Sequence, residues 1–337
     1  MMKKYLSFSF DQLGFTAGPK ARIDADIILK SLGYSAIRIR CSSSNKIIRN
    51  LLMFIDSFRL IFTLKKSDVL FLQMPVIRKN SILIYVIIWL IKPRIQLLIH
   101  DLDFLRGLEK TSIFYFYFLK HSELVIAHTE RMKTYLVENG VSQDVICVLN
   151  LFDYLTDYEN TFPTTFGNNV LFAGNLQKSQ FLNQLDKLSD LQFILYGNIG
   201  DFQISENMIY KGVFSPSDIR NIEGDWGLVW DGDSIDTCSG LFGGYLSINS
   251  SYKTSLYIAC KKPVIAWKGS SLGQFIERNH LGICVDSLKD ISKRIDSLTL
   301  TEINRMKISI KEFSDKLRNG NQLKNIMNNL DIDQTKS

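Results

Sequence analysis

The chain has 337 residues, of which 46% are hydrophobic, and it carries a net charge of +6. This length exceeds the usual size of a single domain and predicts two domains with the sizeable cores of an α/β protein. Five widely spaced cysteines without a CxxC pair argue against a disulfide framework and a zinc site, and they fit a reducing compartment.

The first half of the chain alternates short apolar runs with helical patterns, which is typical of a parallel sheet wound by crossover helices. The predicted strands are Lys4–Phe10, Ser35–Ile39, Val69–Gln73, Ile95–Ile99, Leu124–Ala127 and Val145–Leu149. The predicted helices are Ala21–Leu32, Ile48–Thr63, Ile82–Ile91, Ser112–His121 and Glu130–Asn139. The apolar run that ends at Ile91 falls short of the roughly 20 residues that span a bilayer, so we expect a buried helix followed by a buried strand.

A polar, aromatic stretch, Asp153–Asn169, breaks this rhythm and is predicted to be a linker. The pattern then resumes with strands Val170–Ala173, Gln192–Tyr196, Met208–Lys211, Gly227–Trp230, Val264–Ala266 and Gly282–Val285, and it ends with helices Leu288–Ile295, Thr301–Phe313 and Gln322–Leu330. The predicted architecture is two doubly wound, Rossmann-like domains that face a cleft. We place the N-terminal domain at residues 1–152, the linker at 153–169, the C-terminal domain at 170–311, and a helix at 312–337 that crosses back to the first domain.

Charge is divided unevenly between the two halves. Residues 1–150 carry 21 Lys and Arg against 12 Asp and Glu, a net charge of +9, and the remainder carries −3. A basic domain suits an anionic lipid surface, or it is simply a solvated basic face, and no nucleic-acid-binding motif accompanies it. The first ten residues lack an apolar core of signal-peptide length, so we expect a cytoplasmic protein, with peripheral contact to the inner membrane as one use of the basic half.

The most informative segment follows the apolar run Trp226–Trp230. Three carboxylates (Asp231, Asp233 and Asp236) lie in the next loop, where the carboxyl end of a parallel strand offers a ligand site. Carboxylates there can hold sugar hydroxyls, and their mutual repulsion requires compensating partners. Further on, a polar turn opens an apolar helix whose N-terminus and lysine suit a diphosphate; its residues are Asn249, Ser250, Ser251, Tyr252, Lys253 and Thr254. Cys238 has no neighbouring His and is not expected to be a nucleophile.

Three other strand ends supply weaker candidates for the same ligand. Thr16 lies in a glycine-containing loop after the first strand, either a plain turn or a loop that closes over a substrate. Gly174 and Asn175 end the first strand of the second domain, and Lys178 follows within reach of a phosphate. Tyr196 and Gly197 end the next strand, where the tyrosine either stacks on a base or packs in the core.

His100-Asp101-Leu102-Asp103 occupies the corresponding position in the first domain. Asp101 or Asp103 beside an imidazole suits general-base chemistry on an acceptor hydroxyl, or one of them caps the next helix. Metal ligation is the weaker interpretation because no partner ligand cluster is evident, so we expect neither a metal nor a cofactor. Thr129 has the pattern of a helix cap.

At these residues the chain resembles a family of bacterial GT-B glycosyltransferases that includes β-1,6-galactofuranosyltransferases of O-antigen synthesis and the third glucosyltransferase of streptococcal adhesins. The likeness is carried by the segments Gly227–Gly240, Lys253–Tyr257, Lys262–Trp267, Gly18–Ala25, Leu98–Gly107 and Ala173–Leu176. It implies a GT-B fold, transfer of a hexosyl unit from a UDP-sugar without an essential metal, and UDP contacts at Thr16, Lys178, Tyr196 and the 249–254 segment. Lys178 replaces an arginine of some relatives, and Asn-Ser-Ser-Tyr-Lys replaces the more usual Asn-Asn-Pro-His-Lys.

The resemblance favours galactofuranosyl transfer, β-1,6 linked, to a hydroxyl of a growing surface glycan of O-antigen or capsule type, with a glycan or lipid-linked oligosaccharide as acceptor. Lys253 would stabilise the departing UDP, Asp101 or Asp103 would take the acceptor proton, and Asp231 and Asp233 would hold the sugar. The alternatives are a UDP-glucose-dependent enzyme acting on a glycoprotein adhesin, a non-catalytic GT-B partner subunit, and a sugar-nucleotide epimerase. Relatives often self-associate, which makes a homo-oligomer one option for this chain.

Overall fold

The computed structural model describes residues 2–8, 17–41, 45–75, 82–107, 113–162 and 166–336. The chain divides into two compact units. Unit 1 comprises Met1–Gly14, Arg22–Leu149 and Leu323–Ser337, and unit 2 comprises Phe15–Ala21 and Asn150–Gln322. Leu151 and Tyr154, in or beside the stretch expected as a linker, belong to the hydrophobic core of unit 2.

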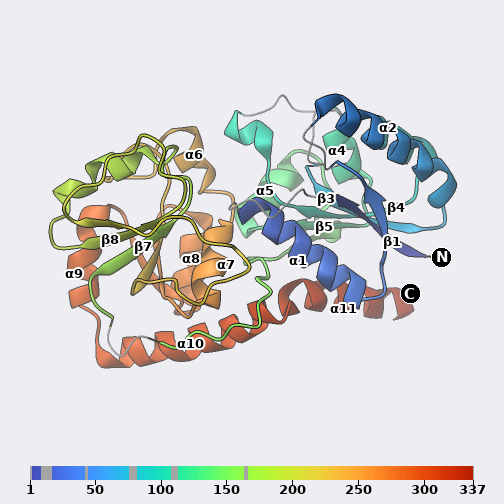
Figure 1. Cartoon of the computed structure of the whole chain (residues 1–337). Coiled ribbons are helices and arrows are strands. Elements are labelled where there is room, and N and C mark those ends of the chain that lie inside the picture. Colours follow the sequence, from blue (N-terminus) through green and yellow to red (C-terminus); the bar gives the residue numbers. More distant parts are fainter. Residues whose placement is uncertain are drawn as a thin grey trace. The chain divides into compact units, whose positions relative to one another are not determined.

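Unit 1 is built on a parallel sheet whose order, over the described residues, is β2-β1-β3-β4-β5-β6. The strands are β1 (Lys3–Phe8), β2 (Ser35–Ile39), β3 (Val69–Met74), β4 (Arg94–Ile99), β5 (Leu124–Ala127) and β6 (Ile146–Val148). Between them run α1 (Ala17–Ser31), α2 (Lys46–Thr63), α3 (Ile82–Ile91), η2 (Asp103–Arg106), α4 (Ile113–Lys120), α5 (Glu130–Glu138) and η3 (Gln143–Val145). Because crossovers are right-handed, α1 covers one face of the sheet and α2 lies on the other side, as Figure 1 shows.

Unit 2 has a second parallel sheet, of order β12-β11-β10-β7-β8-β9 over the described residues. Its strands are β7 (Asn169–Ala173), β8 (Gln192–Tyr196), β9 (Met208–Tyr210), β10 (Trp226–Val229), β11 (Val264–Trp267) and β12 (Gly282–Val285). Its helices are η4 (Gln180–Lys187), α6 (Gly240–Tyr245), α7 (Tyr252–Ala259), α8 (Ser271–Arg278), η5 (Leu288–Asp290), α9 (Ile291–Asp296) and α10 (Leu300–Arg318), and α11 (Asn321–Lys336) returns to unit 1. The strand order reverses between β7 and β10, which is where doubly wound sheets bind ligands.

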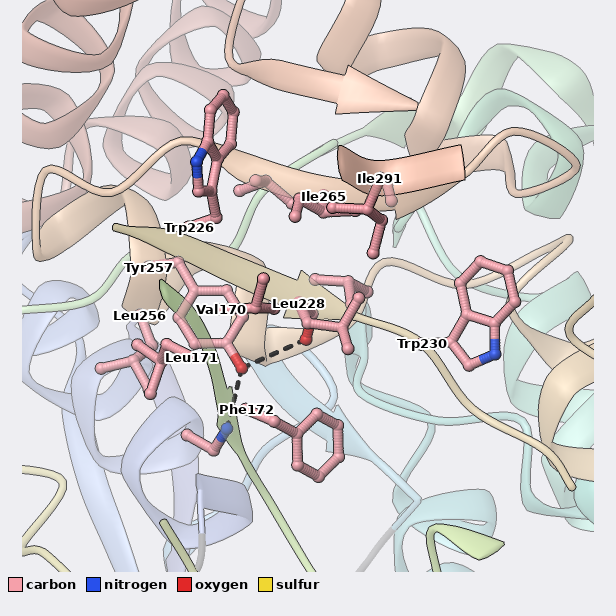
Figure 2. Close-up of a cluster of buried hydrophobic side chains, with 14 of the residues drawn as sticks. Val170, Leu171, Phe172, Trp226, Leu228, Trp230, Leu256, Tyr257, Ile265 and Ile291 are labelled. Carbon is pink, nitrogen blue, oxygen red and sulfur yellow. Dashed lines mark hydrogen bonds between the residues drawn. The ribbon is translucent and has the colours of Figure 1, made fainter. Parts of the chain in front are cut away.

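A buried tyrosine links β7 and β10 at this reversal point. The β7–β10 ladder pairs Val170 with Trp226 and Leu171 with Gly227. Beyond these pairs, the Tyr257 hydroxyl bridges the two strands by hydrogen bonds. It accepts a hydrogen bond from the Ala173 amide at 3.0 Å and donates one to the Leu228 carbonyl at 3.2 Å, the two dashed bonds of Figure 2. A side chain at position 227 would lie 2.1 Å from the tyrosine ring, so only glycine lets the ring pack against β10.

The predicted doubly wound α/β architecture is confirmed, and the predicted strands match the observed ones to within a residue or two at most ends. The apolar segment from Ile82 forms helix α3 and strand β4 as expected, but only the strand is buried throughout; α3 exposes Ile82, Trp89 and Leu90, so the prediction of a buried helix was wrong for that face. Thr129 caps α5 by accepting a hydrogen bond from the Met132 amide at 3.2 Å. Among the described residues, no helix combines the length and the apolar character needed to cross a bilayer. The sequence did not predict η4, α6 or α8.

Candidate active site

Unit 2 contains a cavity of about 270 Å³ at the carboxyl ends of β7 and β8. This is below the roughly 300–1,000 Å³ of sites that enclose a complete drug-sized ligand, so the cavity suits one part of a larger molecule. Its wall combines the ends of the two strands, the loop that follows β9 and the first turns of α7. The lining residues are Tyr154, Ala173, Gly174, Asn175, Tyr196, Gly197, Asn198, Val213, Phe214, Pro216, Tyr252, Lys253 and Leu256.

Aromatic rings make up one side of the cavity. The Tyr196 ring meets Phe214 edge to face at 5.6 Å, and the Tyr154 ring stacks on Tyr252 at 5.2 Å. Two of the three lining tyrosines are anchored through their hydroxyls: Tyr196 donates to the Asn221 carbonyl, and Tyr154 donates to the Pro216 carbonyl. Rings fixed in this way provide a flat, apolar surface suited to a planar ring of a ligand.

Two glycines form a polar part of the cavity wall. The Gly174 amide donates to the Tyr196 carbonyl at 2.9 Å, which ties the end of β7 to the end of β8. Gly197 has a φ of +141°, and a Cβ there would stand 1.7 Å from the Gly174 carbonyl oxygen. Both the backbone angle and the lack of space therefore require glycine at 197, and the chain can approach a ligand closely at this point.

Lys253 reaches this polar side from the first turn of α7. Its ammonium lies 4.3 Å from the centre of the Phe172 ring, and it would be 3.5 Å from a Cβ placed on Gly174. Burial lowers the pKa of Lys253, while the charge of Asp231 opposes that shift. A lysine held among apolar atoms beside the cavity is a cation that an anionic ligand would stabilise.

The start of α7 adds hydrogen-bonding groups that the protein leaves unused. Ser251 occupies the N-cap position without a side-chain capping bond. Over the described part of the chain, Asn249 Oδ1, Thr254 Oγ1 and Ser255 Oγ are buried and have no hydrogen-bond partner. These side chains add polar atoms close to the helix N-terminus, although none of the three residues lines the cavity itself. Ser250 is buried in the same turn.

Each of the three carboxylates after β10 has a different partner. Asp236 pairs with Lys289 at 2.7 Å, and Asp233 accepts a hydrogen bond from the Ser239 hydroxyl. Asp231 accepts a hydrogen bond from the Gly232 amide at 3.0 Å and acts electrostatically on Lys253. We therefore associate Asp231 with the cavity, because Lys253 lines it. Burial raises the pKa of the Cys238 thiol to about 12, which leaves it protonated and a poor nucleophile.

Seven of the predicted contacts that the structure describes do not line this cavity: Lys178, Asp231, Asp233, Asn249, Ser250, Ser251 and Thr254. Lys178 is exposed and does not line it; its backbone amide donates to the Asn175 side chain at 3.2 Å. Thr16 lies outside the described residues. The cavity therefore gathers six of the predicted substrate-binding residues, which are Gly174, Asn175, Tyr196, Gly197, Tyr252 and Lys253.

In unit 1, the predicted base candidates lie at the end of β4. Arg106 pairs with Asp101 at 3.1 Å and with Asp103 at 3.4 Å, so both carboxylates share one cation. Neither caps a helix, because η2 begins after Leu102 without a side-chain capping bond. Within the described residues, no three His, Cys, Asp or Glu side chains gather as metal ligands.

A hydrogen-bonded relay lies beside these carboxylates. The Gln73 amide nitrogen donates to Asp26 at 2.6 Å, so its carbonyl oxygen faces His100 Nε2, which must be the donor in their 2.6 Å contact. Burial, reinforced by the Arg22 charge, holds the pKa of His100 well below its usual value. The ring is therefore neutral, and its one proton lies on Nε2. Burial also raises the pKa of Asp26 to about 6.

Sequence reasoning missed Asp26, Gln73, Arg22, Tyr154 and Phe214. The first three lie within a helix or a strand, where nothing in a pattern marks them as polar partners of a strand end. The Arg22–Asp26 spacing of one helical turn was the available signal.

Comparison with known proteins assigns the chain to a family. Residues 3–151 match the glucosyltransferase 3-like N-terminal domain, and residues 170–330 match the glucosyltransferase 3-like C-terminal domain. The chain belongs to the glucosyltransferase 3-like family. It is 32% identical to the β-1,6-galactofuranosyltransferase WbbI of Escherichia coli K12, over 98% of both chains. It is also 26% identical to glucosyltransferase 3 of Streptococcus gordonii over 201 residues, 59% of this chain and 58% of the relative.

Solved structures show the same fold at low sequence identity. Sucrose-phosphate synthase of Thermosynechococcus elongatus superposes with a TM-score of 0.61 at 11% identity, covering 99% of both chains. The lipopolysaccharide outer core galactosyltransferase WaaB superposes with a TM-score of 0.57 at 12% identity, covering 97% of this chain and 98% of that one. The fold is GT-B, and the chain is a glycosyltransferase of that type.

Proposed function

We propose that the enzyme transfers a hexosyl unit from a UDP-sugar to a hydroxyl group of a growing surface glycan, with galactofuranose as the sugar and a β-1,6 linkage. The closer and longer of the two reported relationships, 32% identity over 98% of the chain, is to a β-1,6-galactofuranosyltransferase. Solved GT-B relatives in complex with UDP or UDP-glucose, such as an α-glucosyltransferase with a TM-score of 0.58, support a UDP-sugar as the donor.

The observation that carries the donor assignment is the cavity of unit 2. The anchored ring of Tyr196 and the Phe214 ring beside it offer an apolar surface for the planar base. Lys253 and the first turn of α7 offer a cation and N–H groups for the diphosphate. The unpaired Thr254 hydroxyl lies in that same turn, where a diphosphate oxygen would satisfy it. Asp231 and Asp233 are our candidates for the sugar hydroxyls.

Transfer forms a bond between the acceptor oxygen and the anomeric carbon and breaks the bond from that carbon to the β-phosphate oxygen. The bonding electrons leave with UDP, and Lys253 and the helix N-terminus stabilise the added negative charge. The acceptor proton passes to a base, for which Asp101 or Asp103 is the candidate within unit 1. The Arg106 contact holds both carboxylates beside one cation, where either could orient or deprotonate a hydroxyl.

A second candidate is glucosyl transfer from UDP-glucose to a glycoprotein adhesin, favoured by the match of both halves to the glucosyltransferase 3-like family. We also propose a cytoplasmic site of action, because all five thiols are free. The acceptor in this proposal is a glycan or lipid-linked oligosaccharide, reached through peripheral contact of the basic unit 1 with the membrane.

A panel of donors tests the proposal. UDP-galactofuranose, UDP-glucose, UDP-galactose and UDP-N-acetylglucosamine are compared for hydrolysis and for thermal stabilisation of the enzyme. Turnover of UDP-galactofuranose above the others supports the first assignment, and preference for UDP-glucose supports the second. Stabilisation by UDP without turnover of any donor would contradict both and indicate a non-catalytic subunit.

A further inference from the structure

Helix α2 of unit 1 exposes an apolar face along its entire length. Met53, Ser57 and Leu60 face the protein interior, and the opposite side carries large hydrophobic residues at helical spacing. Eight of these side chains are exposed, with Ile47 at 78% and Phe62 at 85%: Ile47, Ile48, Leu51, Phe54, Ile55, Phe58, Ile61 and Phe62. A helix that is apolar on both sides normally has a partner on each, so the outer face of α2 is a binding surface.

Basic residues border this face. Lys46 begins the helix, Arg59 lies on it with 65% of its side chain exposed, and Lys65 and Lys66 follow its end. Asp56 is the one acidic residue between positions 45 and 67. It is buried and accepts from Arg40 at 2.9 Å, and it also pairs with Arg59 at 3.4 Å, so the unpaired positive charge beside the outer face comes from the lysines.

We infer that α2 lies in the plane of an anionic phospholipid bilayer, with its apolar face among the acyl chains and its lysines among the headgroups. At 1.5 Å per residue the helix is about 27 Å long, so Lys46 and Lys65 reach phosphates at opposite ends of the buried stripe. Each basic residue near such a surface adds attraction to anionic lipid. The neighbouring helix α3 contributes Trp89, 41% exposed, a residue type favoured at the membrane interface.

Charge decides between a bilayer and a second copy of the chain. A two-fold interface would place the same patch on both sides, so two lysine-rich borders would meet without an acidic partner from α2. An anionic bilayer supplies the missing negative charge. The inference rests on the proposed function for its meaning, since it brings the enzyme to the surface where a lipid-linked acceptor resides.

Vesicle sedimentation of the full chain tests the inference. The probes are vesicles of equal parts phosphatidylglycerol and phosphatidylcholine, compared with vesicles of phosphatidylcholine alone. We expect binding to the anionic vesicles that weakens with added salt. The variant Phe54→Ser/Phe58→Ser/Phe62→Ser should lose at least about tenfold in partitioning, because three inserted rings are removed. Lys65→Glu/Lys66→Glu should lose the preference for anionic lipid.

The matched control is Leu300→Ser/Ile308→Ser, which changes exposed apolar residues of α10 in unit 2 and should bind vesicles like the parent. Absence of parent binding, or equal binding by the triple variant, would overturn the inference. So would an oligomer that the triple variant dissociates without any vesicle binding. We expect the triple variant to hydrolyse the donor as the parent does when no vesicles are present. If the parent hydrolyses no donor but still binds vesicles, the proposed function fails and this inference stands.

Discussion

Replacing Tyr257 by phenylalanine removes one oxygen atom from the core of unit 2. That oxygen accepts from the Ala173 amide and donates to the Leu228 carbonyl, at the point where the β7–β10 ladder stops. Both backbone groups belong to buried residues, with 5% and 0% exposure. The ring itself still fits against Gly227, so the substitution isolates the two hydrogen bonds.

The expected cost follows from those two orphaned groups. A buried amide or carbonyl without a partner costs about 1–3 kcal/mol, with the carbonyl at the lower end. We therefore expect Tyr257→Phe to lower the free energy of unfolding of unit 2 by about 2–4 kcal/mol. UDP binding should weaken as well, because Gly174 follows Ala173 directly and Lys253 lies one turn before Tyr257 on α7.

Urea unfolding followed by tryptophan fluorescence measures this cost, since Trp226, Trp230 and Trp267 lie in unit 2. Tyr210→Phe is the control: its hydroxyl donates to the Gly197 carbonyl from an exposed site where water can replace it, so the change should stay within about 0.5 kcal/mol. A loss below about 1 kcal/mol for Tyr257→Phe would refute the role assigned to its hydroxyl.

Three other substitutions test individual features. Gly197→Ala should destabilise unit 2 by at least about 2 kcal/mol in a thermal melt, because its Cβ would meet the Gly174 carbonyl, whereas Gly212→Ala, with open space around it, should cost only about 1 kcal/mol of backbone strain. Asp26 has a folded-state pKa of about 6, above its usual value, so the free energy of unfolding of the wild type should fall as pH rises from 4 to 6. Asp26→Asn should lack this fall and should be about 1–3 kcal/mol more stable than the wild type at pH 8, as measured by urea titration at each pH. Parallel pH–stability curves of the two proteins would contradict this expectation. Asp231→Asn should raise KM for the donor, while Asp236→Asn, which breaks only an exposed ion pair, should leave kinetics and stability unchanged.

Most of the fold could be predicted because buried parallel strands are short, nearly continuous apolar runs. Val69–Met74 and Gln192–Tyr196 are examples whose borders coincide with changes in polarity. Helix α6 was missed because its sequence, Gly-Leu-Phe-Gly-Gly-Tyr, has too many glycines for a helical pattern. The short helix η4 was missed because it is a 3₁₀ helix of 8 residues, which is too short to show a regular spacing of apolar residues.

The candidate site could be predicted only in part. Residues at strand ends were found because parallel topology brings such ends together, which holds for Gly174 and Tyr196. Partners distant in sequence were not found. The contact of Tyr154 with Tyr252 and the relay from Asp26 through Gln73 to His100 depend on tertiary packing. For the same reason, the sequence did not show that Asp231 would act on Lys253 or that Asp236 would pair with Lys289.

The central claim is that Lys253 and the start of α7 hold the diphosphate of the donor. Isothermal titration of the parent and of Lys253→Ala with UDP and with uridine tests it most directly. We predict that Lys253→Ala loses at least about tenfold in UDP affinity, about 1.4 kcal/mol, and binds uridine as the parent does. Equal UDP affinity in the two proteins, or an equal loss for uridine, would contradict this assignment.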